Sequence, residues 1–70
     1  MKKTMSDEII KALEEIVQAE KMMKERFKRL ADKAPTPELR GLFQELSHEE
    51  EGHEKELTER LTALRLLRDR

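Results

Sequence analysis

Three side chains that are able to bind a metal ion fall at positions where helical patterns should carry core leucines. They are Glu20 and, thirty residues later, Glu50 and His53 in a Glu-x-x-His spacing. A carboxylate on an apolar helix stripe is costly unless it is paired or bound to a cation. Carboxylate and imidazole groups are also ligands for first-row metal ions. These three residues therefore predict a metal site.

The assignment of these residues to apolar stripes depends on helical periodicity. At about 100° per residue, Glu20 lies within roughly 20° of both Leu13 and Phe27, because seven residues nearly complete two turns. The second apolar line advances in steps of four, three and four residues through Leu46, Glu50, His53 and Leu57.

The elements that position these residues follow from the punctuation of the chain. Residues 34–37 (Ala-Pro-Thr-Pro) form the only cluster of helix breakers. Ser6 is a candidate N-cap for a first helix over 7–33, and Thr36 is a candidate N-cap for a second helix over 38–67. The sequence therefore predicts an all-α fold, an antiparallel two-helix hairpin with a turn at 34–37.

A hairpin provides a geometric test of the metal site. In an antiparallel pair, residues equally far from the turn lie at the same height. The midpoint of Glu20 and Glu50 is residue 35, and that of Glu20 and His53 is 36.5, so both midpoints fall within the turn. The three side chains should therefore meet roughly 22 Å from the turn, at about 1.5 Å per residue.

Composition limits the remaining possibilities. The 70 residues form one hairpin domain (1–70), which is too small to build an adequate core alone, and with no cysteine it has no disulfides. A metal or a partner chain is then expected to stabilise it. The near balance of 15 basic and 16 acidic residues argues against nucleic acid as a partner. The sequence has no membrane span and no signal segment, so we expect a cytoplasmic protein.

The set of ligands is half of a known pattern. Di-iron carboxylate bundles take one Glu from each of two helices and a Glu-x-x-His from each of the other two. One chain supplies one Glu and one Glu-x-x-His. A homodimer, or a higher even-numbered homo-oligomer, would complete both the four-helix bundle and a di-iron centre. Manganese or zinc could substitute for iron.

Two stretches of the chain resemble members of the ferritin-like superfamily. Residues 37–39 through 49–53 look like the second helix of encapsulated ferritins, and Leu-Phe-x-x-Leu at 42–46 followed by Glu50-x-x-His53 looks like rubrerythrin. Glu20 followed by Phe27 is similar to the Glu and Tyr of a bacterioferritin first helix. The resemblance covers about residues 8–66.

This resemblance implies a function as well as a fold. Glu20, Glu50 and His53 would be iron ligands and catalytic residues of a ferroxidase, an oxidoreductase that oxidises Fe²⁺ with dioxygen or peroxide for iron storage and detoxification. Encapsulated ferritins assemble further into rings carried inside an encapsulin-type shell, a protein nanocompartment. The chain departs from that family at Ala19 and Met22, where the encapsulated ferritins have acidic residues.

Two alternatives accompany the ferroxidase hypothesis. The first is a non-catalytic dimerisation module in which the polar residues form a buried layer that fixes helix register. The second concerns peripheral residues: Glu45 and His48 also form a Glu-x-x-His pair, but His48 points roughly opposite the apolar line, and Glu49 borders it. Solvated surface is the simpler interpretation of these three, and a peripheral metal site between dimers is the alternative.

Overall fold

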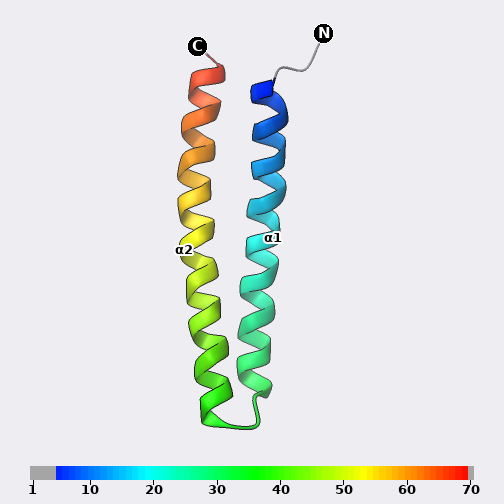
Figure 1. Cartoon of the computed structure of the whole chain (residues 1–70), viewed down its shortest axis with the longest axis vertical. Coiled ribbons are helices and arrows are strands. Elements are labelled where there is room, and N and C mark those ends of the chain that lie inside the picture. Colours follow the sequence, from blue (N-terminus) through cyan, green and yellow to red (C-terminus); the bar gives the residue numbers. More distant parts are fainter. Residues whose placement is uncertain (1–4, 70) are drawn as a thin grey trace.

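Two long helices run antiparallel and place both ends of the chain at the same end of the molecule (Figure 1). The computed structural model describes the backbone of residues 5–69 and the side chains of residues 7–69. Helix α1 spans Met5–Lys33 and helix α2 spans Pro37–Arg68. The molecule is a rod about 54 Å long. Residues 5–69 contain no strand, so the all-α hairpin predicted from the sequence is confirmed.

The turn between the helices is short and well capped. Thr36 has an extended backbone, and its side-chain oxygen accepts a hydrogen bond from the Leu39 amide at 3.2 Å. Thr36 is therefore the N-cap of α2, as predicted. Pro37 is the first helical residue, where no backbone N–H is needed, and Glu38 lies at the positive end of the helix dipole. This connection holds the two helices as close antiparallel neighbours.

Three of the four helix ends differ from the predicted bounds by one or two residues, and the predicted end of the first helix at Lys33 is confirmed. Helix α1 begins at Met5, so Ser6 lies inside the helix instead of capping it. The four-residue spacing of Met5 and Ile9 extends the apolar pattern by another turn. Helix α2 begins at Pro37 and ends at Arg68, one residue beyond the predicted bound at each end.

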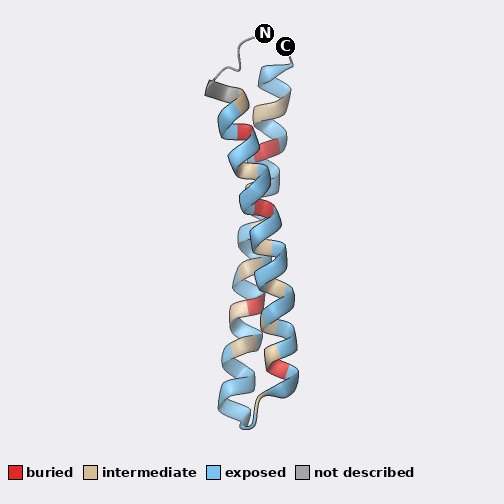
Figure 2. Ribbon diagram, turned by 90° about the vertical axis from the view of Figure 1, so that its right-hand side faces the viewer, coloured by how far each residue is buried: buried red, intermediate tan, exposed pale blue. Residues whose placement is uncertain are grey.

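The core of the hairpin is a single line of residues between the helices. Figure 2 shows the buried positions spaced along the contact between α1 and α2. The rings of Phe27 and Phe43 stack near the turn, with centroids 6.5 Å apart. The described side chains that are buried are Ile10, Val17, Ala31, Ser47 and Leu61. So narrow a core buries little apolar surface for a chain of this length.

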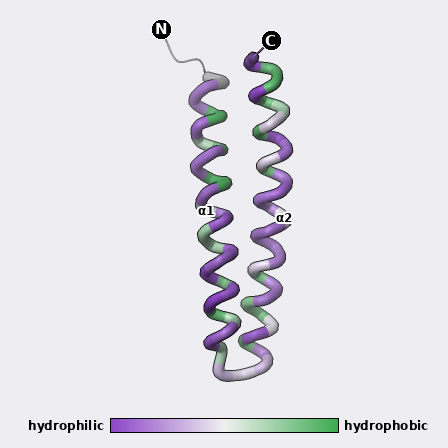
Figure 3. The backbone as a smooth tube through the Cα atoms, turned by 180° about the vertical axis from the view of Figure 1, so that it is seen from behind, coloured by the Kyte–Doolittle hydropathy of each residue, from purple (hydrophilic) through white to green (hydrophobic). Residues whose placement is uncertain are grey.

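One face of the hairpin carries apolar side chains that the other described residues leave partly exposed. On α1, Ile9, Ile16 and Met23 follow each other at seven-residue steps and so share one side of the helix; on α2, Leu39 and Leu42 lie on the matching side. These five side chains are between 39% and 47% exposed. We name this surface the open face. Figure 3 shows such apolar positions as isolated green bands on otherwise polar helices.

Charge is arranged in opposite order along the two helices. The half of α1 near the turn is mostly basic and lies beside a mostly acidic half of α2, while the signs reverse toward the free ends. Arg65 contacts Glu14 at 2.6 Å and Arg68 contacts Asp7 at 3.6 Å across that end. Neither of the two described helices has a stretch long and apolar enough to cross a membrane.

Candidate metal centre

The structure brings Glu20, Glu50 and His53 together at the middle of the hairpin. Glu20 lies near the centre of α1, and Glu50 and His53 lie one turn apart near the centre of α2. Each residue offers one ligand atom, and these atoms all lie within 4.8 Å of one another. Within the described residues, this is the single group of three or more acidic, histidine or cysteine side chains with such spacing. The convergence predicted from the hairpin midpoints is therefore observed.

The three side chains differ in depth. Nδ1 of His53 lies 3.4 Å from Oε2 of Glu20, with the histidine side chain 59% exposed and the Glu20 side chain 22% exposed. Glu50 is half-buried. A groove of about 310 Å³ beside the cluster is lined by Glu20 and His53 together with Glu56, Leu57 and Arg60. The cluster thus has two carboxylates on its inner side and an imidazole at its solvent edge.

The two carboxylates are not satisfied by the described part of the chain. Oε2 of Glu20 and Oε2 of Glu50 are buried and have no hydrogen-bond partner within residues 7–69. Two carboxylates have no proton to share, but a proton on Glu50 can be donated to Glu20. This hydrogen bond is the main cause that raises the pKa of Glu50; burial and the negative charge of Glu20 act in the same direction, while His53 opposes them.

A second polar contact crosses the hairpin at the same height and was not foreseen from the sequence. Nζ of Lys24 lies 2.9 Å from Oε2 of Glu54, and both side chains are less than one-fifth exposed. The hydroxyl of Ser47 donates a hydrogen bond to the backbone oxygen of Lys24 at 3.2 Å. The hydrogen bond with Glu54 raises the pKa of Lys24. The midpoint of Lys24 and Glu54 is residue 39, which lies outside the turn, so the midpoint test does not indicate this pair.

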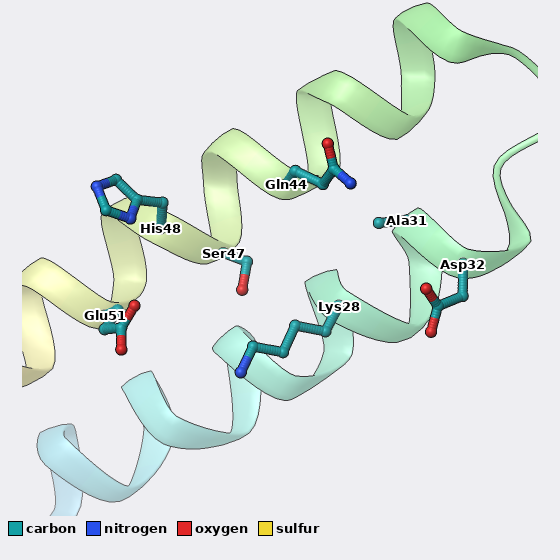
Figure 4. A pocket seen from close by; sticks show the side chains of 7 residues that line it. All are labelled: Lys28, Ala31, Asp32, Gln44, Ser47, His48 and Glu51. Atoms are coloured by element: carbon teal, nitrogen blue, oxygen red, sulfur yellow. The ribbon is translucent and has the colours of Figure 1, made fainter.

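The peripheral candidates Glu45, His48 and Glu49 lie outside the cluster, and all three are exposed. Figure 4 shows His48 projecting from α2 on the side away from α1. It borders an open groove of about 420 Å³. The other residues that line this groove are Lys28, Ala31, Asp32, Gln44, Ser47 and Glu51. The simpler interpretation, a solvated surface, agrees with this exposure.

A comparison with known protein families matches residues 8–67 to the domain of unknown function DUF2383. The chain belongs to this family. The DUF2383 match includes most of both helices and the whole turn, so Glu20, Glu50 and His53 all lie within the domain. The description of DUF2383 names no activity. Searches among curated proteins and among solved structures gave no match to the chain.

Proposed function

We propose that Glu20, Glu50 and His53 bind a divalent metal ion, with iron as the metal used. The observation that carries this proposal is a pair of buried carboxylate oxygens, one on Glu20 and one on Glu50, that have no hydrogen-bond partner among the described residues. The Glu20 oxygen lies 3.4 Å from Nδ1 of His53. Such atoms are unfavourable in the chain by itself. A cation is the partner that two carboxylates and a neutral imidazole can share.

The residues present fit such an ion. Carboxylate oxygens and imidazole nitrogens bind an ion such as Zn²⁺ at about 2.0–2.2 Å, so two ligands of one ion stand up to about 4.4 Å apart. The three ligand atoms lie within 4.8 Å of one another, which is close to that spacing. The one-turn separation of Glu50 and His53 on α2 puts both on the side of the helix that faces Glu20.

A second copy of the chain would complete the centre. One hairpin offers two carboxylates and one imidazole, whereas a dimer offers four and two, which is the set found in ferritin-like di-iron bundles. The same dimer would cover the open face. Stability and metal binding therefore require the same assembly, a four-helix bundle made of two hairpins.

The activity that we propose is ferroxidation, in which Fe²⁺ is the substrate. Two ferrous ions each lose one electron, and dioxygen accepts both electrons and two protons to give hydrogen peroxide. In the peroxide-dependent reaction, hydrogen peroxide accepts two electrons and two protons to give water. Glu20 and Glu50 hold the substrate ions, and His53 completes the ligand set at the solvent edge, where the groove beside it allows exchange.

The resemblance to encapsulated ferritins extends the proposal to a physiological role. Ferric product would be stored or detoxified, and a hairpin of this size cannot enclose a mineral by itself. Storage then needs a shell, such as an encapsulin-type compartment in the cytoplasm. Manganese or zinc would occupy the same ligands in place of iron but would not undergo this oxidation.

Metal stoichiometry measured together with mass tests the proposal. Anaerobic titration with Fe²⁺ followed by sedimentation should give one ion per chain in a dimer or a higher even-numbered assembly. Admission of oxygen should then oxidise the bound iron rapidly. A folded monomer, or a dimer that binds no Fe²⁺, Mn²⁺ or Zn²⁺, would contradict the shared centre.

The second candidate function is a dimerisation module whose polar layer fixes register. The raised pKa of Glu50 favours it, because one proton shared with Glu20 would satisfy the layer without metal. The two candidates differ in one measurement. Replacement of Glu20 and Glu50 by Leu should give a more stable helical assembly in both cases, but it removes metal binding only if the residues are ligands.

A further inference from the structure

We propose that the outer side of α1 near the turn binds a short acidic segment of a partner protein. The contact would use the cations of Arg26, Arg29 and Lys33 together with the apolar side chain of Met22. This surface lies on a different side of α1 from the candidate metal centre and from the open face. The inference therefore does not depend on the proposed function.

Four residues share this outer side of α1. Met22, Arg26, Arg29 and Lys33 follow each other at steps of four, three and four residues, a spacing that keeps to one side of an α-helix. The buried side chain of Val17 lies five residues before Met22, which is about 140° around the helix at about 100° per residue. The four residues therefore lie on the side of α1 away from α2, and we name them the basic stripe.

The basic stripe would stay uncovered in a dimer that covers the open face. Met23, which belongs to the open face, is the residue after Met22 and so lies about 100° around the helix from it. A partner on the stripe and a second copy on the open face could therefore bind at the same time.

The three cations of the basic stripe have no counter-charge in the described chain. All three are exposed, and none takes part in an ion pair within residues 7–69. The neighbouring Lys24 and Lys28, by contrast, are paired with Glu54 and Glu25. A guanidinium group can donate two parallel hydrogen bonds to one carboxylate. The stripe thus offers two such groups and an ammonium to an acidic partner.

Met22 adds an apolar contact among these cations. Its side chain is 72% exposed, more than any other large apolar side chain in the part of the chain that the structure describes. An open groove of about 400 Å³ runs beside it. The residues that line this groove are Lys21, Met22, Met23, Glu25, Arg26 and Arg29. Because a methionine side chain is flexible and polarizable, it adapts to the surface of a partner. The groove therefore suits a segment that carries both carboxylates and an apolar side chain.

The length of the basic stripe favours an acidic protein segment over nucleic acid. From Met22 to Lys33 it extends about 17 Å, at about 1.5 Å per residue. Nearer the free end, α1 carries another groove, lined by Asp7, Glu8, Lys11, Ala12 and Glu15, which is mostly acidic. Duplex DNA carries a negative charge about every 1.7 Å, so a duplex laid along α1 would meet these acids. A segment of about three helical turns would contact the cations alone.

Binding of a designed peptide tests the proposal. The probe is a fluorescent helical peptide with one leucine and three glutamates at the steps of the stripe, in a background of alanine and glutamine. Anisotropy would be measured with the full chain in EDTA, so that the glutamates cannot bind a metal ion. We expect saturable binding that weakens as salt is added, since the contacts are between exposed charges. The same peptide with glutamine in place of glutamate should not bind.

Charge reversal locates the binding surface. Arg29→Glu should weaken peptide binding by about tenfold or more, because an attractive contact becomes repulsive. Lys11→Glu is the matched control, since Lys11 is also an exposed cation of α1 without an ion pair in residues 7–69, and the substitution changes the net charge equally. It should leave peptide binding unchanged. Circular dichroism would verify that both variants remain helical.

A pair of substitutions tests the apolar contact separately. Met22→Ser should weaken peptide binding several-fold, because it removes the apolar side chain and leaves every charge in place. Met22→Leu should bind as the wild-type chain does. Equal binding by all three chains would show that charge alone attracts the peptide and would overturn the assigned contact.

Four further outcomes would overturn the proposal. One is absence of peptide binding at low salt, and another is an equal loss in Arg29→Glu and Lys11→Glu. The third is tighter binding of a DNA oligonucleotide or of phosphatidylglycerol vesicles that Arg29→Glu abolishes. The fourth is self-association of the chain, without peptide, that Arg29→Glu abolishes, which would assign the stripe to a second copy. Each measurement is made without metal, so none of these outcomes bears on the metal centre.

Discussion

Two groups of polar side chains lie between the helices at nearly the same height, the Lys24–Glu54 pair and the cluster of Glu20, Glu50 and His53. They differ in whether their partly buried charges are paired within the chain. Lys24 and Glu54 form an ion pair of 2.9 Å that is complete within the chain. Glu20 and Glu50 are also half-buried, yet each has a carboxylate oxygen with no hydrogen-bond partner among the side chains that the structure describes. The first group has one charge of each sign, whereas the second has two acids and only an exposed histidine to oppose them.

This difference indicates what each group is for. A pair that satisfies itself fixes the register of α1 against α2 and needs nothing else. A group with unmet acceptors destabilises the isolated chain and stabilises any state in which a cation supplies the missing charge. Substitutions in the two groups should therefore have opposite effects on the stability of the metal-free protein.

The largest effect should come from removing a ligand. His53→Ala should reduce the rate of Fe²⁺ oxidation by at least about 100-fold, since even residues that only support metal ligands contribute 10- to 100-fold. Ferric absorbance after mixing with oxygenated buffer measures the rate. His48→Ala is the control, because His48 is an exposed histidine on the same helix and should retain most activity. A wild-type rate of Fe²⁺ oxidation in His53→Ala would show that the cluster does not carry out the reaction.

The next effect is stabilisation by metal. Zn²⁺ at 100 times its Kd should stabilise the folded protein by about 2.7 kcal/mol, which corresponds to a rise in Tm of about 10 °C or more for a chain of this size. Thermal unfolding followed by circular dichroism measures it. Lys24→Met should retain the rise, since Lys24 is bound to Glu54 and is not a ligand. An unchanged Tm for the wild-type protein would argue against a built site.

A smaller effect is expected in the self-satisfied pair. Glu54→Gln keeps the shape of the side chain but leaves the ammonium of Lys24 without its counter-charge, so it should lower the Tm of the metal-free protein by a few degrees. Metal affinity should change little. A higher Tm for metal-free Glu54→Gln would contradict the view that the Lys24–Glu54 pair stabilises the chain while the carboxylates of Glu20 and Glu50 destabilise it.

The smallest effect should have the opposite sign. Glu50→Gln removes a charge from the crowded acids and should raise the Tm of the metal-free protein at neutral pH while lowering metal affinity. Because the folded state raises the pKa of Glu50, its stabilising proton is present at pH below 4.5 and is lost as the pH rises through the folded pKa. The advantage of Glu50→Gln should therefore shrink on acidification toward pH 4.5. An advantage that grows on acidification would contradict this sign.

Spacing alone was sufficient to predict the hairpin and the meeting of its three polar residues. The breaker cluster at 34–37 allowed one turn, and an antiparallel pair then fixes which residues share a height. Glu20 and Glu50 stood out because leucines or phenylalanines flank them at helical intervals. Both inferences need only the periodicity of the α-helix.

The contact between Lys24 and Glu54 could not be read in the same way. A lysine near an apolar line usually extends its charged end to solvent. Here the side chain of Lys24 instead extends diagonally across to Glu54 on α2. Whether a lysine does so depends on how closely the two helices pack. The start of α1 at Met5 was missed for another reason, since a serine followed by two acids is equally compatible with a cap and with a first turn.

The three-residue turn also governs the order in which the hairpin comes apart. Pairs next to Thr36 are close in sequence, whereas Glu14 and Arg65 close a loop of 51 residues. The free ends of the helices should therefore open first, and amide exchange should slow progressively toward the turn. The ion pairs of Arg65 with Glu14 and of Arg68 with Asp7 link the two helices at this free end and oppose its opening. Removal of these ion pairs should raise the amide exchange rates at the free ends of the helices and leave the rates at the centre of the hairpin unchanged.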